Sequence, residues 1–162
     1  MSEVPFYAID FETYYEPGLG IKDLGVGGYV NHPKFDAYMV SLVGPGIEFV
    51  GHPKDAPWGK LPEVFDFVAH NMGFDRQVYG RLQKYLPNFY PSARRWWCTA
   101  NLSVYLNADR NLKGASAQLL GIKVDKQMRG YMNGKTWADA VADGKDKELL
   151  QYALDDSKLC WE

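Results

Sequence analysis

Two carboxylates stand one residue apart near the start of the chain, in the stretch FYAIDFETYY at residues 6 to 15. The neighbouring residues are apolar or aromatic, which predicts a buried strand. Side chains alternate between the two faces of a strand, so Asp10 and Glu12 share one face and Ile9 and Phe11 take the other. Two like charges side by side repel each other and lose hydration, which indicates that a cation binds between them.

Two further patterns place oxygen-bearing side chains at fixed spacings. Asn71 and Asp75 form an N-x3-D motif where a predicted strand turns into a helix, with Asp75 on the first helical turn. Tyr152 and Asp156 are spaced i, i+4 in the predicted last helix, so they lie one turn apart on the same face. Asp155 is the alternative to Asp156, and the spacing favours Asp156. Each pattern alone is common, since an acid near a helix start is usually a cap or a dipole partner.

The three motifs in this order, IDFET, AHNMGFD and YALDD, resemble those of the DEDD exonucleases of the DnaQ-like superfamily. Members of that superfamily have a D-x-E strand, an N-x3-D junction and, in the DEDDy variant, a Y-x3-D helix. The resemblance covers essentially the whole chain. It implies an α/β, ribonuclease H-like fold with a mixed central sheet of about five strands flanked by helices. It also implies a 3′-5′ exonuclease that acts on single-stranded DNA and releases nucleoside monophosphates.

A narrower similarity is to the proofreading exonuclease of phage-type family A DNA polymerases. There, D-F-E-T-Y-Y is followed by a Y-V/I-x-x-P-x-F stretch, which is similar to Tyr29, Val30, Pro33 and Phe35 here. We therefore expect residues 1 to 162 to form a single exonuclease domain, either free-standing or the N-terminal part of a longer polymerase. Its expected partners are a single-stranded DNA 3′ end and a polymerase domain or other replication proteins.

Phosphodiester hydrolysis needs an attacking hydroxide and a stabilised leaving oxygen, which two divalent cations about 4 Å apart can supply. The resemblance implies two Mg²⁺ or Mn²⁺ ions, both of which favour carboxylate oxygens. Asp10, Glu12 and Asp156 would ligate the ion that activates water, and Asp10 and Asp75 would hold the second. Tyr152 would orient the nucleophilic water, because a phenol with a pKa near 10 is a poor base at neutral pH.

Substrate contacts are predicted around these motifs. Asn71 is expected to hold the substrate strand or the local turn, and Tyr14 and Tyr15 either stack on the terminal bases or pack in the core. His70 is expected to be structural rather than a ligand. The stretch RRWW at 94 to 97 offers a basic and aromatic patch that is expected to be solvated or packed rather than essential. The candidate substrate-binding residues are Asn71, Phe11, Thr13, Tyr14, Tyr15 and Lys113.

Periodicity and turn residues predict the elements that carry these side chains. Strands are predicted at 5 to 12, 35 to 43, 46 to 51 and 65 to 71, the first three as a meander. Helices are predicted at 74 to 86, around 114 to 121 and from Asp146 to the last residue, with a strand end leading into a helix at 94 to 106. The segment 52 to 62 is predicted to be an exposed loop, and 123 to 145 to form helical turns and a flexible loop.

Composition limits the function classes. A chain of 162 residues that is 46% hydrophobic can build the core of one domain. It shows neither a membrane span nor a secretory signal, so we expect a cytoplasmic protein, in the host cytoplasm if it is phage-encoded. Cys98 and Cys160 are expected to be reduced and structural. A net charge of −2 does not indicate a basic nucleic-acid-binding face, so cations or a local basic patch must neutralise the substrate.

Three alternatives stay open at this point. An exoribonuclease of the same superfamily would carry the same motifs, because contacts to the 2′-OH are not visible in them. A catalytically silent nucleic-acid-binding module would keep the fold, although such a module usually loses at least one carboxylate. A structural partner module of a replication complex need not bind a metal at all.

Overall fold

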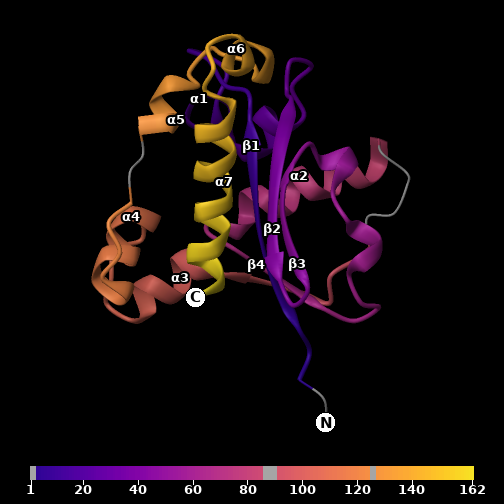
Figure 1. The fold of residues 1–162 in the computed structure, drawn as a ribbon, viewed down its shortest axis with the longest axis vertical. Coiled ribbons are helices and arrows are strands. Elements are labelled where there is room, and N and C mark those ends of the chain that lie inside the picture. The colour runs from indigo at the N-terminus through magenta and orange to yellow at the C-terminus, as the bar shows by residue number, and fades with distance from the viewer. Residues whose placement is uncertain (1–2, 86–90, 125–126) are drawn as a thin grey trace.

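The structure is a computed structural model, and it describes residues 3–85, 91–124 and 127–162. In these residues, five strands form a mixed sheet in the order β3-β2-β1-β4-β5 (Figure 1). β1 pairs antiparallel with β2, and β2 with β3, whereas β1, β4 and β5 run parallel. The predicted mixed sheet of about five strands is confirmed. The strands are β1 (Phe6–Thr13), β2 (Ala37–Gly44), β3 (Ile47–Gly51), β4 (Asp66–Ala69) and β5 (Arg95–Cys98).

Helices cover both faces of the sheet, with the long helix α7 on one side and α2 on the other (Figure 1). The sheet therefore has two separate apolar faces, each closed by one long helix. The helices are α1 (Ile21–Val30), α2 (Met72–Tyr85), α3 (Thr99–Tyr105), α4 (Leu112–Ala115), α5 (Gln127–Tyr131), α6 (Trp137–Ala142) and α7 (Asp146–Trp161), with a π-helical turn at Ser116–Leu120 after α4.

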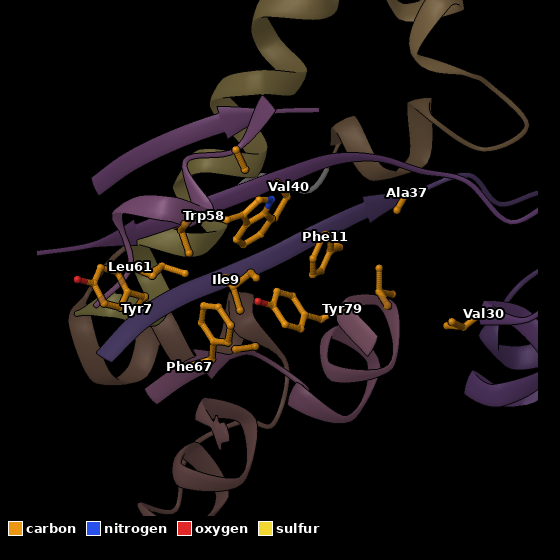
Figure 2. Packing of buried hydrophobic residues seen from close by; sticks show 14 of the residues in the cluster. Tyr7, Ile9, Phe11, Val30, Ala37, Val40, Trp58, Leu61, Phe67 and Tyr79 are labelled. Atoms are coloured by element: carbon orange, nitrogen blue, oxygen red, sulfur yellow. The ribbon is translucent and has the colours of Figure 1, made fainter. Parts of the chain in front are cut away.

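The central strand β1 separates these two faces by the alternation of its side chains. Ile9 and Phe11 lie in the core beside α2, where they belong to one cluster with Val78 and Tyr79 (Figure 2). Ala8 belongs to a different cluster on the α7 side. Asp10 and Glu12 point to that second side, so the prediction that they share one face, opposite Ile9 and Phe11, is confirmed.

The segment between β3 and β4 differs from its prediction as an exposed loop, which is wrong. It forms two short 3₁₀ turns, Pro53–Asp55 and Trp58–Lys60, and Trp58 is only 4% exposed. The Trp58 indole donates to the Pro53 carbonyl over 2.8 Å and packs edge-on against the Tyr79 ring. The apolar side chains of this segment extend the core despite its many Pro, Gly and Lys residues.

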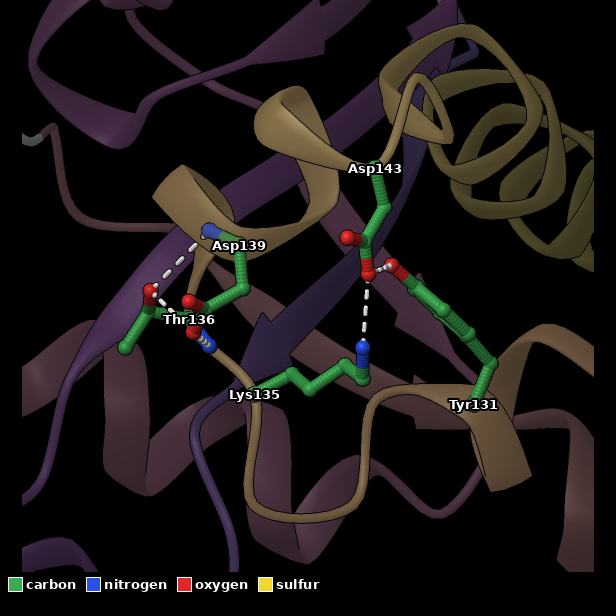
Figure 3. Close-up of polar contacts among 5 residues, drawn as sticks. All are labelled: Tyr131, Lys135, Thr136, Asp139 and Asp143. Carbon is green, nitrogen blue, oxygen red and sulfur yellow. Dashed lines mark hydrogen bonds and ion pairs between the residues drawn. The ribbon is translucent and has the colours of Figure 1, made fainter.

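The segment before α7 contains the predicted helical turns as α5 and α6, and polar contacts hold them together. Thr136 and Asp139 form a capping box at the start of α6, and Asp143 accepts hydrogen bonds from both Tyr131 and Lys135 (Figure 3). These contacts place α6 against α7, where Ala140 is fully buried.

Most of the remaining strands and helices lie close to their predicted bounds. The predicted strands and the helices at 74 to 86 and from Asp146 are present within one to three residues of their predicted bounds, except that Leu86 lies outside the described residues. No periodicity in the sequence predicts α1, which is kinked at Gly25, where φ is 65°. Both cysteines are unpaired, as predicted. Within the described ranges, no helix has the length and apolar character needed to cross a membrane.

Candidate metal centre

Three carboxylates from the two ends of the chain meet beside the central strand. Asp10 and Glu12 extend from β1 and Asp156 from α7, and one oxygen of each lies within 4.8 Å of the other two. Asp156 is 6% exposed, and the two strand carboxylates are half-buried. Oxygen ligands lie about 2.0 to 2.6 Å from Mg²⁺ or Ca²⁺, so oxygens at this spacing can surround one cation. The three side chains could therefore hold a metal ion.

The position of α7 is fixed by a buried contact next to this cluster. Ser157 follows Asp156, and its hydroxyl lies 2.5 Å from the hydroxyl of Ser41 on β2, with both side chains fully buried. Ser41 is the cross-strand partner of Asp10. Because a buried hydroxyl needs a hydrogen-bond partner, this pair holds α7 at one rotation and one height over the sheet. Asp156 is thereby kept beside Asp10.

Tyr152 joins the cluster one helical turn before Asp156. Burial raises the pKa of its phenol above the ordinary value, and the charges of Glu12, Asp156 and Asp10 raise that pKa further. A hydrogen bond with Asp156 acts in the same direction, because the neutral phenol donates to the carboxylate. The phenol is therefore a neutral donor at the edge of the acidic cluster, on the same face of α7 as Asp156, as the i, i+4 spacing predicts.

Asp75 lies outside this group of three and has a different environment. It is 1% exposed, and its Oδ1 accepts a hydrogen bond from the Phe11 amide over 3.1 Å. Burial raises the pKa of the Asp75 carboxyl well above its usual range, and the nearby charge of Asp10 raises it further, against the opposing effect of the Phe11 amide. Asp75 is thus close enough to the cluster for the charge of Asp10 to raise its pKa, and it also accepts a hydrogen bond from the main chain of β1.

The end of the β1–β4 ladder explains why Asp75 can reach that amide. The register between β1 and β4 ends at the pair Ala8–Val68, so the Phe11 N–H lies beyond it. The chain then turns at Asn71, whose φ of 69° is in the left-handed region that Asn tolerates better than most residues. This turn starts α2 at Met72 and brings its first turn under the end of β1.

The predicted substrate-binding residues lie in several environments. Phe11 is 4% exposed in the core, so only its main chain faces the cluster. The Thr13 hydroxyl accepts from Tyr29 over 2.8 Å, and the Tyr14 hydroxyl donates to Glu16 over 2.8 Å. The Tyr15 hydroxyl donates to the Arg129 carbonyl.

The remaining candidates lie at the surface or in the turn after β4. The Asn71 and Lys113 side chains are exposed, the latter on α4. His70 uses both ring nitrogens, one 2.9 Å from the Thr99 hydroxyl and one 2.8 Å from the Arg110 carbonyl. Its contacts are those of the structural residue that was predicted.

A pocket of about 600 Å³ opens beside the cluster on the outer side of α7. Its lining includes Tyr152 and Asp156 together with the apolar residues Ile122, Val124 and Met128. Its volume is in the range of small-molecule pockets, and its walls combine apolar surface with a few polar groups. A ligand in this pocket would contact the phenol and the carboxylate together.

Two features of this region, a buried serine pair and a buried tyrosine, were missed by sequence reasoning. The Ser41–Ser157 pair carries no local signal, because Ser41 is a single hydroxyl in an apolar strand and Ser157 lies among charged residues of a helix. Tyr38 is 5% exposed, and its hydroxyl has no hydrogen-bond partner among the described residues. Burial raises the pKa of this phenol, with the charge of Glu12 as the next cause, so it too lies near the cluster. Only the folded arrangement reveals either feature.

Comparison with known proteins does not identify a family for this chain. No protein-family model matches the chain, and no curated protein matches it. The functional interpretation therefore depends on the arrangement of the acidic cluster and on the motifs that predicted it.

Proposed function

We propose that the protein is a metal-dependent 3′-5′ exonuclease of the DEDDy type, which hydrolyses phosphodiester bonds at the 3′ end of single-stranded DNA. One observation carries the proposal: Asp10, Glu12 and Asp156, far apart in the sequence, have carboxylate oxygens within 4.8 Å of one another, with Tyr152 one turn from Asp156. Folding gains nothing from gathering like charges, so such a cluster is better explained by a bound cation and its chemistry.

The topology supports a ribonuclease H-like assignment. An antiparallel meander of β1, β2 and β3 is continued by β4 and β5, which run parallel to β1. The acidic pair lies on the middle strand, and α7 brings the last carboxylate over it. This arrangement agrees with the D-x-E strand, N-x3-D junction and Y-x3-D helix of the DnaQ-like exonucleases.

In the proposed reaction, the carboxylates of the cluster bind the metal ion and Tyr152 orients the water. When bound, a Mg²⁺ or Mn²⁺ ion supplies a Lewis acid that activates water and stabilises charge on the phosphate. Asp10, Glu12 and Asp156 would hold such an ion with the hard oxygen donors it prefers. The neutral phenol of Tyr152, whose O–H is directed at Asp156, would orient the attacking water by accepting a hydrogen bond from it, and would not remove its proton, because the pKa of the phenol is raised.

Asp75 would contribute to a second ion together with Asp10. Its carboxyl is buried with a raised pKa, and Asp10 is the charge that raises it most. A second cation between Asp10 and Asp75 would favour the ionised form of both and lower that pKa. The bond from the Phe11 amide would keep the Asp75 carboxylate in place while it held that ion.

We further propose that this exonuclease serves proofreading in DNA replication, next to a polymerase domain. The support is the similarity of DFETYY and of the stretch before β2 to the exonucleases of phage-type family A polymerases. Nucleoside monophosphates would then be the products, and a frayed primer terminus the substrate.

The test is a gel time course on a 5′-labelled single-stranded DNA oligomer with Mg²⁺ or Mn²⁺, run beside a matched RNA oligomer. Asp156→Ala is compared with Asp155→Ala, which removes the adjacent exposed carboxylate, an acceptor for the Gln151 side chain on the same helix. We expect a ladder that shortens from the 3′ end with the parent and with Asp155→Ala, and no ladder with EDTA or with Asp156→Ala.

Each contrary result has a definite meaning. Equal activity of the two variants would reject the acidic cluster as the catalytic site. Degradation of RNA alone would make the protein an exoribonuclease. An intact oligomer at high enzyme concentration, with Mn²⁺ binding also absent by calorimetry, would reject the nuclease altogether.

A further inference from the structure

The pairing of β1 with β2 is irregular beside the acidic cluster. Glu12 pairs with Met39, and Thr13 pairs with Ala37. Tyr38 is therefore an extra residue on β2, which makes a β-bulge and interrupts the alternation of side chains along the strand. Ala37 belongs to the core cluster on the α2 side, whereas Tyr38 and Met39 both belong to the cluster that packs against α7. The bulge thus turns Tyr38 to the face of the sheet that carries Glu12.

The hydroxyl of Tyr38 is buried at this position without an acceptor. Tyr38 is 5% exposed, and its hydroxyl has no hydrogen-bond partner among the described residues. A buried donor that makes no hydrogen bond costs free energy of folding, because it has lost its bond to water. Such groups are rare in native proteins, and each one needs an explanation in terms of function or of a bound ion or water.

Glu12 is the charged group that acts most strongly on this phenol. Burial is the main cause of the raised pKa of Tyr38, and among the charges Glu12 contributes most to the rise. A carboxylate that binds a cation through one oxygen keeps lone pairs on its other oxygen. Glu12 can therefore bind an ion and accept a hydrogen bond from a buried hydroxyl at the same time.

Other phenols near Glu12 are already engaged. Burial raises the pKa of three of them, and the charge of Glu12 adds to the rise in each. Their acceptors are the Arg129 carbonyl for Tyr15, the Thr13 hydroxyl for Tyr29 and the Asp156 carboxylate for Tyr152. Among the described residues, Tyr38 is the phenol of this group whose O–H is still available to Glu12.

We propose that Tyr38 is a positioning residue of the metal centre, and that its hydroxyl donates to the Glu12 carboxylate when this carboxylate binds a cation. Glu12 has the longest side chain of the three clustered acids, so it has the most conformations to lose on binding an ion. A donor behind a ligating carboxylate restricts those conformations, and its removal typically lowers metal affinity by about 10- to 100-fold. The inference rests on the proposed function and deepens it by naming the group that holds Glu12.

The main test measures Mn²⁺ affinity by calorimetry and the melting temperature in EDTA for Tyr38→Phe and Tyr7→Phe. Tyr7 is the matched control, because it is 3% exposed and lies in the cluster on the α2 side. We expect Tyr38→Phe to bind Mn²⁺ about tenfold more weakly. Its melting temperature in EDTA should stay equal or rise, because a buried hydroxyl without a partner is removed.

Tyr7→Phe should change neither property in this way. Its hydroxyl already donates to the Pro45 carbonyl over 3.4 Å, so its loss should not raise the melting temperature. Its Mn²⁺ affinity should stay within about twofold of the parent, because Tyr7 lies on the opposite face of the sheet from the cluster.

A role of Tyr38 in packing alone predicts a different pair of results. A residue needed only for the core would lower the melting temperature of the metal-free protein and the metal affinity together. Equal Mn²⁺ affinity of Tyr38→Phe and the parent would overturn the inference. So would a weaker affinity that is accompanied by a lower melting temperature in EDTA.

A double-mutant cycle tests whether the effect passes through Glu12. Tyr38→Phe is added to Glu12→Ala and, as the matched background, to Asp75→Asn, which removes a different carboxylate near the cluster. Electron paramagnetic resonance measures Mn²⁺ binding up to millimolar concentrations. We expect the effect of Tyr38→Phe to stay about tenfold in Asp75→Asn and to fall to about twofold or less in Glu12→Ala. An equal effect in both backgrounds would overturn the inference.

Failure of this inference can be told apart from failure of the proposed function. If the parent degrades the labelled oligomer and Tyr38→Phe binds Mn²⁺ as the parent does, the inference is overturned and the nuclease stands. If the parent binds Mn²⁺ but leaves the oligomer intact, the nuclease is rejected, and a tenfold weaker affinity of Tyr38→Phe still supports the positioning role. Absence of Mn²⁺ binding by the parent would overturn both.

Discussion

Asp66 and Asp75 are both buried carboxylates, 4% and 1% exposed, and they have opposite environments. Asp66 receives hydrogen bonds from the Arg94 guanidinium and the Trp97 indole, and the bond from Arg94 is the largest cause of its lowered pKa. Asp75 receives the Phe11 amide, but burial and the charge of Asp10 raise its pKa well above the usual range. Asp66 is thus paired with a cationic side chain, Arg94, whereas Asp75 lies beside another acid, Asp10.

The difference is the one expected between a structural carboxylate and the metal-binding carboxylate that we propose. A buried acid with an arginine and an indole donor is satisfied by the fold, whereas one beside further acids needs a cation from outside. The end of the sheet at Asp66 therefore stabilises the protein. The end at Asp10 costs stability in metal-free protein and is explained by what it can bind.

The strongest test of this comparison is Asp10→Asn. Removing one charge from the acidic cluster should lower exonuclease activity by about a thousandfold or more, because a metal ligand shared by both proposed ions is lost. The melting temperature in EDTA should stay equal or rise, since repulsion within the cluster is relieved. Initial rates on the labelled oligomer and a thermal melt measure the two effects, and activity within a few-fold of the parent would contradict the assignment.

Tyr152→Phe should have a smaller effect on the same centre. We expect hydrolysis to slow by about tenfold, because the water loses the phenol oxygen that orients it, while Mn²⁺ binding by calorimetry stays as in the parent. A loss of Mn²⁺ affinity would show instead that the phenol supports the position of Asp156.

Asp66→Asn should give the converse of Asp10→Asn. The neutral amide leaves Arg94 without its charged partner, so we expect the melting temperature to fall by roughly 5 °C. The rate per folded molecule on a small substrate, the p-nitrophenyl ester of thymidine 5′-monophosphate, should stay within about twofold of the parent. If ester turnover fell with stability unchanged, the division between the two ends of the sheet would be wrong.

Asp75→Asn should raise the stability of metal-free protein by a small amount, because the amide oxygen can still accept the Phe11 N–H while the buried charge is removed. The pH dependence has a definite sign. A raised carboxyl pKa means that the native state holds the proton more tightly than the unfolded chain, so the parent in EDTA loses stability as pH rises from about 3.9 through the raised pKa.

Asp66 acts in the other direction, since its lowered pKa gives stability that is present above about pH 4 and is lost as pH falls further. Asp75→Asn should therefore flatten the loss on the alkaline side and leave the loss on the acid side unchanged. Urea unfolding in EDTA at a series of pH values measures both slopes. If the loss of unfolding free energy with rising pH were the same in Asp75→Asn and the parent, ionisation of Asp75 would not destabilise the native state.

Periodicity predicted much of this structure from the sequence. Strand alternation placed Asp10 and Glu12 on one face, and helical spacing placed Tyr152 beside Asp156. Neither rule says where a ladder stops, so the bond from the Phe11 amide to Asp75 had no signal. It exists because β4 ends early and α2 begins under β1.

Composition gave a wrong prediction for segments in which one or two large apolar residues determine the packing. The segment with Trp58 is rich in Pro, Gly and Lys, but one buried indole is enough to bring it into the core. The stretch RRWW behaves oppositely in alternate positions, with Trp96 packed in the core cluster and Trp97 half exposed. Treating the four residues as one patch concealed the alternation that the strand imposes on them.

The bond between the Phe11 amide and Asp75 makes one main-chain group a possible spectroscopic probe of the proposed metal centre. The Phe11 ring is fixed in the core, so the environment of its amide proton changes chiefly with the charge on the carboxylate that accepts it. In a ¹⁵N-labelled sample, the chemical shift and hydrogen-exchange rate of this single resonance should follow protonation of Asp75 and titration with Mg²⁺. Occupancy of the centre could then be followed in catalytically silent variants, where no turnover can report it.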